Sequence, residues 1–188
     1  RMVDVVMGAL AQAWPDHVAG GGYGSACVYT LGGFDPRRQK PFVHYETVGG
    51  GMGATAHRHG ANGIRVHMGN TMNLPIESME THIPVRFLEY GIAPRSGGAG
   101  RFAGGCGVTK RLEVLVDGVQ ASLLGERTRT PAVGVAGGQP GAPARFTLSS
   151  DGVERVLPAK SGPHRLRRGD VMSMTTAGGG GWGSPDAS

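Results

Sequence analysis

The highest density of side chains able to do chemistry lies in residues 67–77, which read HMGNTMNLPIE. These residues follow an apolar run that is typical of a strand, and loops at strand ends commonly carry functional groups. Amides and hydroxyls both donate and accept hydrogen bonds, so they can hold an amide or ring carbonyl, whereas histidine and glutamate can transfer protons near neutral pH. The candidate catalytic residues are therefore His67, Asn70, Thr71, Asn73 and Glu77.

The same segment also suits an ordinary helix entry. Asn70 and Asn73 are good residues for capping turns, Pro75 is typical of a first helical position, and Glu77 would then lie in the first turn. The residues alone favour neither interpretation.

Three glycine clusters, at residues 49–53, 97–107 and 178–183, raise the question of a phosphate-binding loop. Residues 98–103 approach the pattern GxGxxG, but a strand-like run follows them instead of a helix whose N-terminus could bind a pyrophosphate. The chain also contains no GxxxxGK[ST] motif. We therefore predict structural turns and close-packed loops at these glycines and no nucleotide or cofactor site on this chain.

Two further groups could in principle bind metal. His57 and His59 are two residues apart and could pair with Glu46 or His67, but their loop offers no regularly spaced third ligand, so solvent-exposed histidines are expected. Cys27 and Cys106 belong to no CxxC motif. We predict buried, reduced thiols and no metal site.

Charge and hydropathy exclude two classes of protein. The formal charge is +5, but the basic residues are dispersed, and the densest group, residues 164–168, has no aromatic neighbours on which bases could stack. Nucleic-acid binding is therefore not expected, and an anionic substrate or an acidic partner would explain the charge. No apolar run approaches the ~20 residues of a membrane span and no signal peptide is evident, which indicates a cytoplasmic protein.

The hydrophobic pattern predicts a mainly β (α+β) fold made of antiparallel strands, glycine-rich loops and one N-terminal amphipathic helix packed on one side. The helix is expected over residues 2–14, where apolar side chains recur with helical spacing until Pro15 and Asp16 end it. The dipeptides Asp117-Gly118 and Asp151-Gly152 each predict a hairpin. Strands are expected at residues 26–31, 42–47, 64–68, 85–90, 109–116, 120–124, 145–148, 154–157 and 171–175.

This pattern divides the chain into a helix (1–15), a strand-rich region (25–177) and a glycine-rich tail (178–188). The helical spacing of apolar residues is already present at the start of the chain, which indicates a piece of a longer protein.

Five ordered blocks closely resemble the C-terminal part of the hydantoinase B/5-oxoprolinase family. They are YETVGGGMGA (45–54), HMGNTMNLPIE (67–77), PVRFLEYGIAPRSGGAGRFAGGCGV (84–108), GGQPGAP (137–143) and the tail GGGGWG followed by SP. The resemblance runs through nearly all of residues 1–188, and five blocks in order are far more specific than any single glycine motif.

The resemblance implies a part of an ATP-dependent hydrolase that opens a cyclic amide such as a hydantoin or 5-oxoproline. Its ATP site would lie on a hydantoinase A-type partner in a hetero-oligomer, and any divalent metal would lie in an N-terminal portion outside this chain. Two alternatives are a ketone carboxylase subunit of the acetone carboxylase type and a non-catalytic assembly module.

The resemblance also favours the active-site interpretation of residues 67–77 over the helix entry. Asn70, Thr71 and Asn73 would orient the activated ring, with His67 and Glu77 handling protons or holding the loop. Glu46 is a further candidate for the same pocket, and Arg95 and Arg101 are candidates to meet phosphate.

Overall fold

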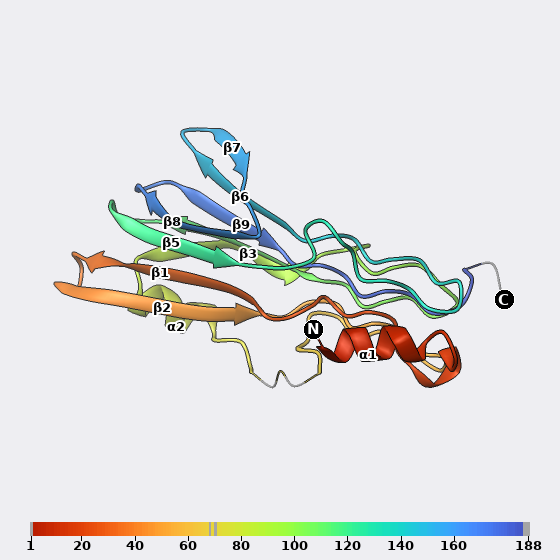
Figure 1. Cartoon of the computed structure of the whole chain (residues 1–188). Helices are drawn as coiled ribbons and strands as arrows, with labels where there is room; N and C mark the ends of the chain where they lie inside the picture. Colours follow the sequence, from red (N-terminus) through yellow and green to blue (C-terminus); the bar gives the residue numbers. More distant parts are fainter. Residues whose placement is uncertain (1, 68, 70, 186–188) are drawn as a thin grey trace.

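The computed structural model describes residues 2–67, 69 and 71–185. Figure 1 shows two parts lying end to end: a sandwich of two β-sheets, and a set of extended chains that continue from it toward the C-terminus. Helix α1 (Met2–Leu10) runs beside the extended chains, whereas α2 (Ile76–His82) lies beside the sandwich. None of the described helices is long and apolar enough to cross a membrane.

Both sheets are antiparallel, as the sequence predicted. The four-stranded sheet has the order β2-β1-β5-β8 and the five-stranded sheet the order β3-β4-β9-β6-β7. The strands are β1 (Cys27–Asp35), β2 (Lys40–Val48), β3 (Val85–Ile92), β4 (Val108–Val114), β5 (Val119–Leu124), β6 (Arg145–Ser150), β7 (Val153–Val156), β8 (Lys160–Leu166) and β9 (Val171–Thr175).

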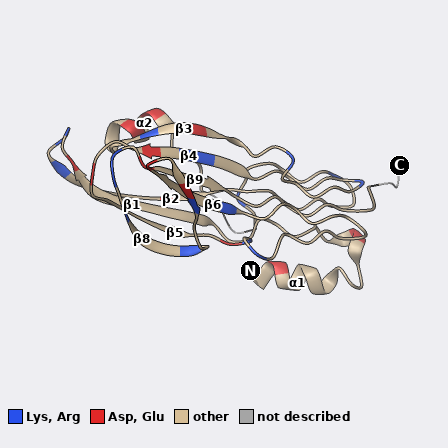
Figure 2. Ribbon diagram, turned by 90° about the horizontal axis from the view of Figure 1, so that it is seen from above, with Lys and Arg blue, Asp and Glu red and all other residues tan. Residues whose placement is uncertain are grey.

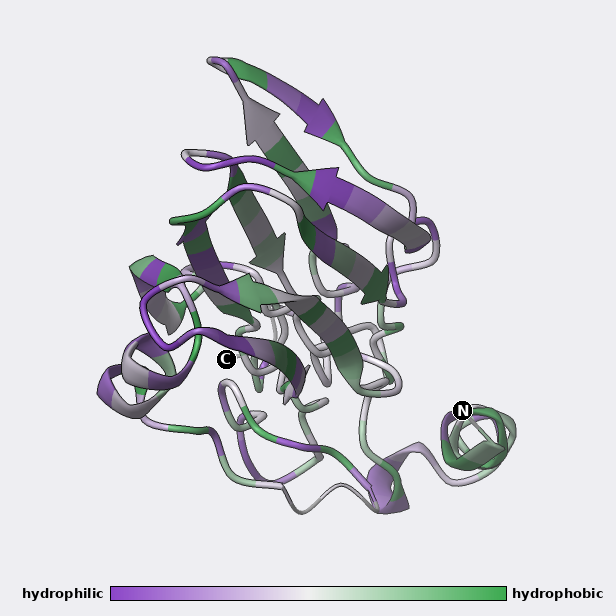
Figure 3. Cartoon of the chain, turned by 90° about the vertical axis from the view of Figure 1, so that its left-hand side faces the viewer, coloured by the Kyte–Doolittle hydropathy of each residue, from purple (hydrophilic) through white to green (hydrophobic). Residues whose placement is uncertain are grey.

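The sandwich core forms where alternate residues of the two sheets face each other. In β4, Val108, Leu112 and Val114 are buried and in β5 every second residue is buried, which is the two-residue period of a half-buried strand. Full burial of one such apolar side chain contributes about 1.5–3 kcal/mol. Figure 3 looks toward this end of the molecule and shows the hydrophobic bands along the strands.

Eight of the nine predicted strands overlap observed ones, one predicted strand is absent, and one observed strand was not predicted. Residues 64–68 form no strand: Ile64 makes an isolated bridge to Gly50, and Met68 lies outside the described residues. Strand β8 was not predicted, because its sequence KSGPHRL contains glycine and proline. It lies at a sheet edge, where a proline without an N–H is tolerated.

Of the two hairpins predicted from Asp-Gly dipeptides, one is present and one is not. Asp151 and Gly152 have φ angles of 51° and 79°, as a type I′ turn requires, and they join β6 to β7 in a hairpin. Gly118 also has positive φ (80°), but β4 and β5 belong to different sheets. The hairpin predicted at Asp117-Gly118 is therefore wrong, and the turn instead carries the chain across the sandwich.

The N-terminal helix is shorter than predicted and does not pack with its apolar face. It ends at Leu10, and no residue of α1 is buried. On the predicted face, Val6 is 56% exposed and Trp14, beyond the helix, is 62% exposed. Figure 3 shows the helix set apart from both sheets.

The extended chains form a second kind of structure, which we call the glycine bundle and define as residues 20–23, 49–54, 96–107, 132–142 and 177–183. Its segments are joined by backbone hydrogen bonds, for example from Gly98 to Gly179, from Gly179 to Gly105 and from Gly105 to Met52. Outside a few isolated bridges, the described residues of the bundle form no regular strand. Segment 177–183 bonds to all four of the others, so it runs through the bundle.

Close packing, and not turn formation, accounts for most of the clustered glycines. A Cβ atom on Gly51 would lie 1.9 Å from the carbonyl oxygen of Gly105, and one on Gly104 would lie 2.0 Å from that of Gly179. Neither glycine has positive φ. At these positions the close-packed part of the prediction holds and the turn part does not, because neighbouring backbones occupy the space of a side chain.

Candidate functional site

Residues 67–77 are divided among three environments. His67 faces one cavity, Thr71 and Asn73 line another, and the segment ends in α2. Asn70 lies outside the described residues. The C-terminal part is indeed a helix entry: Pro75 is the residue before the helix, and Glu77 is exposed in its first turn.

Thr71 and Asn73 contribute to what we call the polar groove, formed by two adjoining cavities of about 360 and 210 Å³. Gly63 and Asn73 line both cavities, so the two lie side by side. The lining residues are Gly63, Ile64, Arg65, Gly69, Thr71, Met72, Asn73, Tyr90, Gly91, Ile92 and Val108. The groove is thus lined by an asparagine, a threonine and an arginine together with Tyr90.

The guanidinium of Arg65 is held in place at the groove. Its Nη2 donates a hydrogen bond to the carbonyl oxygen of Thr47. Its charge also acts on Tyr90, where burial raises the pKa of the phenol and Arg65 partly opposes that rise. The Tyr90 hydroxyl is buried and has no hydrogen-bond partner among the described residues.

Beneath Tyr90 lies a buried ionic network that contains Glu46. Lys110, whose side chain is fully buried, donates from Nζ to Glu46 Oε1 at 2.6 Å, and the hydroxyl of Tyr29 donates to the other carboxylate oxygen. The Lys110 ammonium also lies 4.2 Å from the centre of the Tyr90 ring. Glu46 therefore reaches the groove only through Lys110 and Tyr90.

Opposing effects fix the charges in this network. Burial alone would raise the pKa of Glu46, but the nearby His44, the charge of Lys110 and the hydrogen bonds from Lys110 and Tyr29 lower it to about 2. Burial lowers the pKa of Lys110, and Glu46 partly opposes this. The contact with His44 is long: its Nε2 lies 3.5 Å from the carboxylate and makes no hydrogen bond to a described residue, so Lys110 and Tyr29 are the hydrogen-bond partners of Glu46.

His67 lies in a larger cavity of about 620 Å³ between α1 and the glycine bundle, which we call the helix cavity. Its Nε2 donates to Asp4 Oδ1 at 2.9 Å, and Arg127 Nη2 donates to Asp4 Oδ2 at 2.8 Å. The Asp4 carboxylate can therefore orient the imidazole of His67, an arrangement that suits proton transfer.

The backbone around the helix cavity is unusual. His67, Arg127 and Ala136 all have φ between 52° and 59°, although none of them is glycine. Non-glycine residues in this left-handed conformation carry some strain and occur preferentially at functional sites. The outliers therefore add weight to the helix cavity as a functional region.

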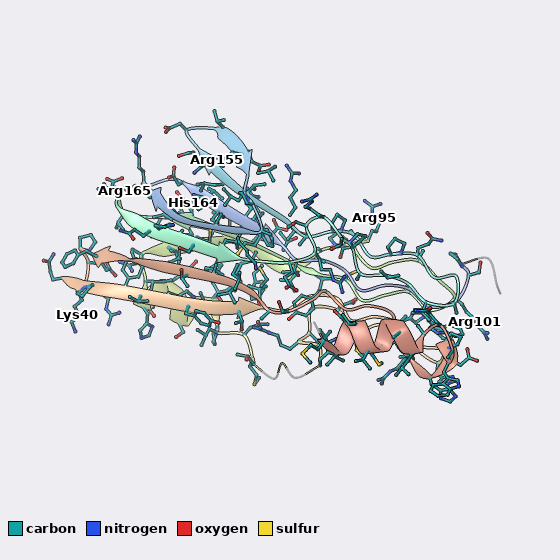
Figure 4. All side chains as sticks on the ribbon, in the orientation of Figure 1. Lys40, Arg95, Arg101, Arg155, His164 and Arg165 are labelled. Atoms are coloured by element: carbon teal, nitrogen blue, oxygen red, sulfur yellow. The ribbon has the colours of Figure 1, made fainter. Side chains whose placement is uncertain are left out.

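The remaining candidates from the sequence lie elsewhere. His57 and His59 are exposed, and His59 Nδ1 accepts a hydrogen bond from the Ala103 N–H at 2.9 Å. No group of three metal-binding side chains was found among the described residues. Arg95 and Arg101 lie at separate points along the glycine bundle in Figure 4, so they do not converge on one phosphate.

The two cysteines differ from each other. Cys27 is buried, and burial raises the pKa of its thiol to about 12 although Arg65 and Lys110 oppose the rise. Cys106 is only partly buried, in contrast to the prediction. Burial would raise its pKa, but hydrogen bonds involving Gly97, Ser96 and Arg95 lower it. Both thiols are free, as expected.

Sequence reasoning missed Asp4, Arg65, Lys110 and Arg127. Lys110 did carry a signal, because it shares the inward-facing parity of Val108, Leu112 and Val114 in a strand with alternating burial. A lysine at such a position must find a buried counter-ion. Asp4 and Arg127 are 123 positions apart in the chain, and no local pattern connects them.

The chain is similar in sequence to proteins of one family. The family model described as hydantoinase B/oxoprolinase matches residues 1–185. The chain is 31% identical over 194 residues to the 5-oxoprolinase PfmaA of Pestalotiopsis fici, covering 99% of this chain and 15% of that protein. It is 33% identical over 141 residues to the beta subunit of caprolactamase from Pseudomonas jessenii, covering 72% of this chain and 24% of that subunit.

Solved structures share the fold. ATP-dependent caprolactamase from Pseudomonas jessenii aligns with a TM-score of 0.79 at 29% identity, over 94% of this chain and 32% of that one. Nucleotide-free acetone carboxylase aligns with a TM-score of 0.68 at 21% identity, over 94% of this chain and 28% of that one, which shows a shared fold alone. The chain spans less than a third of each of these proteins. The family match nevertheless extends over almost every residue, and the chain belongs to the hydantoinase B/oxoprolinase family.

Proposed function

We propose that this chain is part of the B-type subunit of an ATP-dependent hydrolase that opens a cyclic amide, a hydantoin or 5-oxoproline. The observation that carries the proposal is the polar groove, where Thr71 and Asn73 lie beside Arg65 and Tyr90 in a member of this family. Two relatives are named for the hydrolysis of cyclic amides, 5-oxoprolinase and caprolactamase.

The chemistry of the groove suits such a substrate. An unstrained lactam resists hydrolysis because its amide resonance must be lost. Phosphorylation of the carbonyl oxygen makes the carbonyl carbon easier for water to attack. Asn73 and Thr71 can hydrogen-bond the ring amide, and the positive charge of Arg65 favours an anionic activated ring. Asn70 is retained as an orienting residue on its place in the sequence.

His67 lies on the other side of the same segment and faces the helix cavity. We propose that His67, hydrogen-bonded to Asp4, holds the loop that presents Thr71 and Asn73 to the polar groove. Glu77 is exposed at the start of α2, a position that suits holding the loop. Glu46 is proposed to act by positioning Tyr90 through Lys110, without touching the substrate.

ATP is proposed to bind a hydantoinase A-type partner subunit or domain, so that the two together form a hetero-oligomer. The caprolactamase relative is a beta subunit of an ATP-dependent enzyme, which supports such a division. A divalent metal, if the enzyme uses one, would be held by residues outside this chain. An enzyme that consumes ATP in this way is expected in the cytoplasm.

The test measures ATP-dependent ring opening by the complete complex, with 5-oxoproline, hydantoins and caprolactam as substrates. Thr71→Ala and Asn73→Ala should each lower kcat/KM by about a hundredfold, the effect of losing one stabilising hydrogen bond in a transition state. His67→Ala and Asn70→Ala should also lower turnover. Thr130→Ala is the matched control, because Thr130 is an exposed threonine outside both cavities.

Other outcomes would contradict the proposal. Variants that weaken partner binding at normal turnover would indicate an assembly module. ATP-dependent consumption of a ketone with bicarbonate, without lactam hydrolysis, would indicate the carboxylase alternative.

A further inference from the structure

The two sheets of the sandwich differ in the sides that they turn away from the core. Three ion pairs lie along the outer side of the five-stranded sheet: Arg86 with Glu113, Arg111 with Glu89, and Arg145 with Glu154. Figure 2 shows both acidic and basic positions on the strands of this sheet. Paired, exposed charges of this kind are typical of a surface that faces water.

The outer side of the four-stranded sheet follows from its register. In β1, Cys27, Tyr29 and Leu31 belong to the core, so the alternate residues point outward. Residues that pair directly across neighbouring strands share the same side of a sheet. We call this side the outer sheet face and define it as the even-numbered residues of 28–34 and 120–124, the odd-numbered residues of 41–47, and Lys160 and Arg165.

Large apolar side chains on the outer sheet face are exposed to solvent. Val43 is 86% exposed, Tyr45 62% and Phe34 51%. Pro41, Val43 and Tyr45 follow one another along one side of β2, and Phe34 of β1 pairs with Pro41. Figure 1 shows β1 and β2 side by side at the lower border of the sandwich. An apolar surface that is contiguous in this way marks an interaction site.

The charges of the outer sheet face all have one sign. Lys160 and Arg165 are exposed on β8, and the described residues of this face include no aspartate or glutamate. Figure 4 shows Lys40 as a further cation at the end of β2. A second copy of the chain would bring like charges together, which is unfavourable. The complementary surface is therefore apolar at its centre and bordered by carboxylates.

We propose that the outer sheet face binds the hydantoinase A-type subunit, through apolar side chains of that subunit bordered by aspartate or glutamate. The inference rests on the proposed function for the existence of this subunit. The caprolactamase relative is named as a beta subunit, which supports a partner subunit for this chain. Tyr45 and Phe34 lie at the centre of the contact, and Lys160 and Arg165 lie at its polar rim. No residue of the outer sheet face lines the polar groove or the helix cavity.

The first test measures the Kd between the full-length subunit and the A-type subunit by biolayer interferometry. Val43→Glu should raise the Kd at least about tenfold, because the new carboxylate loses water against apolar and acidic side chains. The natural side chain is almost entirely in solvent, so the variant should fold normally. Val156→Glu is the matched control and should bind unchanged, since Val156 is 65% exposed in β7 of the other sheet.

The second test addresses the charge of the partner. Arg165→Glu should slow association with the A-type subunit and make the association rate less sensitive to salt, because salt screens attraction between opposite charges. Association that is no slower in Arg165→Glu than in the natural protein would overturn the acidic character of the partner surface.

The third test identifies other occupants of the outer sheet face. Hydroxyl radicals should oxidise Tyr45 in the free full-length subunit and leave it protected in the complex, as read by mass spectrometry. Protection in the free subunit would overturn the proposal. Sedimentation at two concentrations would then assign the cover to a second copy, if the subunit self-associates, or to another part of the same subunit.

Ring opening, measured on the same samples, separates this inference from the proposed function. If Val43→Glu weakens binding but the natural complex opens no ring, the proposed function fails and the docking face stands. If the natural complex opens rings while Val43→Glu and Val156→Glu bind the A-type subunit equally, the docking face is overturned and the proposed function stands.

Discussion

The sandwich and the glycine bundle are stabilised by opposite means. In the sandwich, large side chains such as Phe146, Leu112 and Leu166 fill the space between sheets. In the bundle, the backbones themselves fill that space and exclude any Cβ atom at positions such as Gly51 and Gly104. Figure 2 shows the charged residues mainly on the sandwich, while the extended chains are almost uncharged. The glycines of the bundle are thus packing residues, as the apolar residues of the sandwich are.

The largest expected effect follows from adding one methyl group to the bundle. Gly104→Ala would place a Cβ atom 2.0 Å from the Gly179 carbonyl oxygen, which cannot move without breaking neighbouring hydrogen bonds. We expect a loss of more than about 4 kcal/mol in the free energy of unfolding, or no folded protein. Urea denaturation of the full-length protein, or its soluble yield, measures this.

Gly91→Ala is the control for that substitution. Gly91 lies in β3 of the sandwich, and no atom lies within 4 Å of the position of its added Cβ. Alanine there should change stability by less than about 1 kcal/mol. Similar losses of stability in Gly104→Ala and Gly91→Ala would show that the glycine bundle tolerates an added methyl group no worse than the sandwich does.

The second prediction concerns the ionic network inside the sandwich. Lys110→Met removes the cation and leaves Glu46 buried without its main partner, which should destabilise the protein by about 3–5 kcal/mol. The double variant Lys110→Met, Glu46→Leu removes both charges and should recover most of that loss. Denaturation curves of the two variants provide the test, and a double variant no more stable than the single one would contradict it.

The third prediction compares Cys27 in the sandwich with Cys106 in the glycine bundle. At pH 8, iodoacetamide should modify Cys106 at least about a hundredfold faster than Cys27, because only a thiolate reacts and Cys27 is buried with a raised pKa. Mass spectrometry of the two peptides in the folded full-length protein gives both rates. Equal rates in the folded state would show that the sandwich does not protect its thiol.

The smallest expected effect is a pH dependence from Glu46. Its pKa falls from 4.5 to about 2 on folding, so its contribution to stability is complete above pH 4.5 and is lost as the pH falls toward 2. We expect a loss on the order of 2 kcal/mol across this range, reduced from the full shift because Lys110 is coupled to it. Urea denaturation between pH 5 and pH 3 measures it.

Glu46→Gln is the control for this pH dependence, since the amide does not titrate. Its stability should change less with pH over the same range than that of the natural protein. If the stability of Glu46→Gln and of the natural protein fell equally with pH, the acid sensitivity would come from other carboxylates.

Local patterns in the sequence predicted much of the fold because short-range rules govern those parts. Short apolar runs between glycine clusters predicted strands such as β5 and β9, and Asp151-Gly152 predicted a hairpin turn. The same rule failed at Asp117-Gly118, since a turn dipeptide fixes local backbone angles but not the strand that comes next. Strand β8 escaped prediction because its position at a sheet edge, and not its composition, makes it a strand.

The candidate site was predictable only in part, because short-range rules do not say which distant segments lie side by side. The polar residues of segment 67–77 were evident from their types, but their division between the polar groove and the helix cavity was not. Arg65 and Tyr90 became groove residues only when strand β3 was placed beside the segment.

The sequence by itself determined the class of fold, the family and the segment of greatest chemical interest, because these depend on residue types and their order. Only the tertiary structure decided that Asp4 meets His67 and Arg127, that Lys110 is buried with Glu46, and that the glycines form a bundle. These are contacts between distant segments. They are set by how the sheets and extended chains pack, which no local spacing in the sequence encodes.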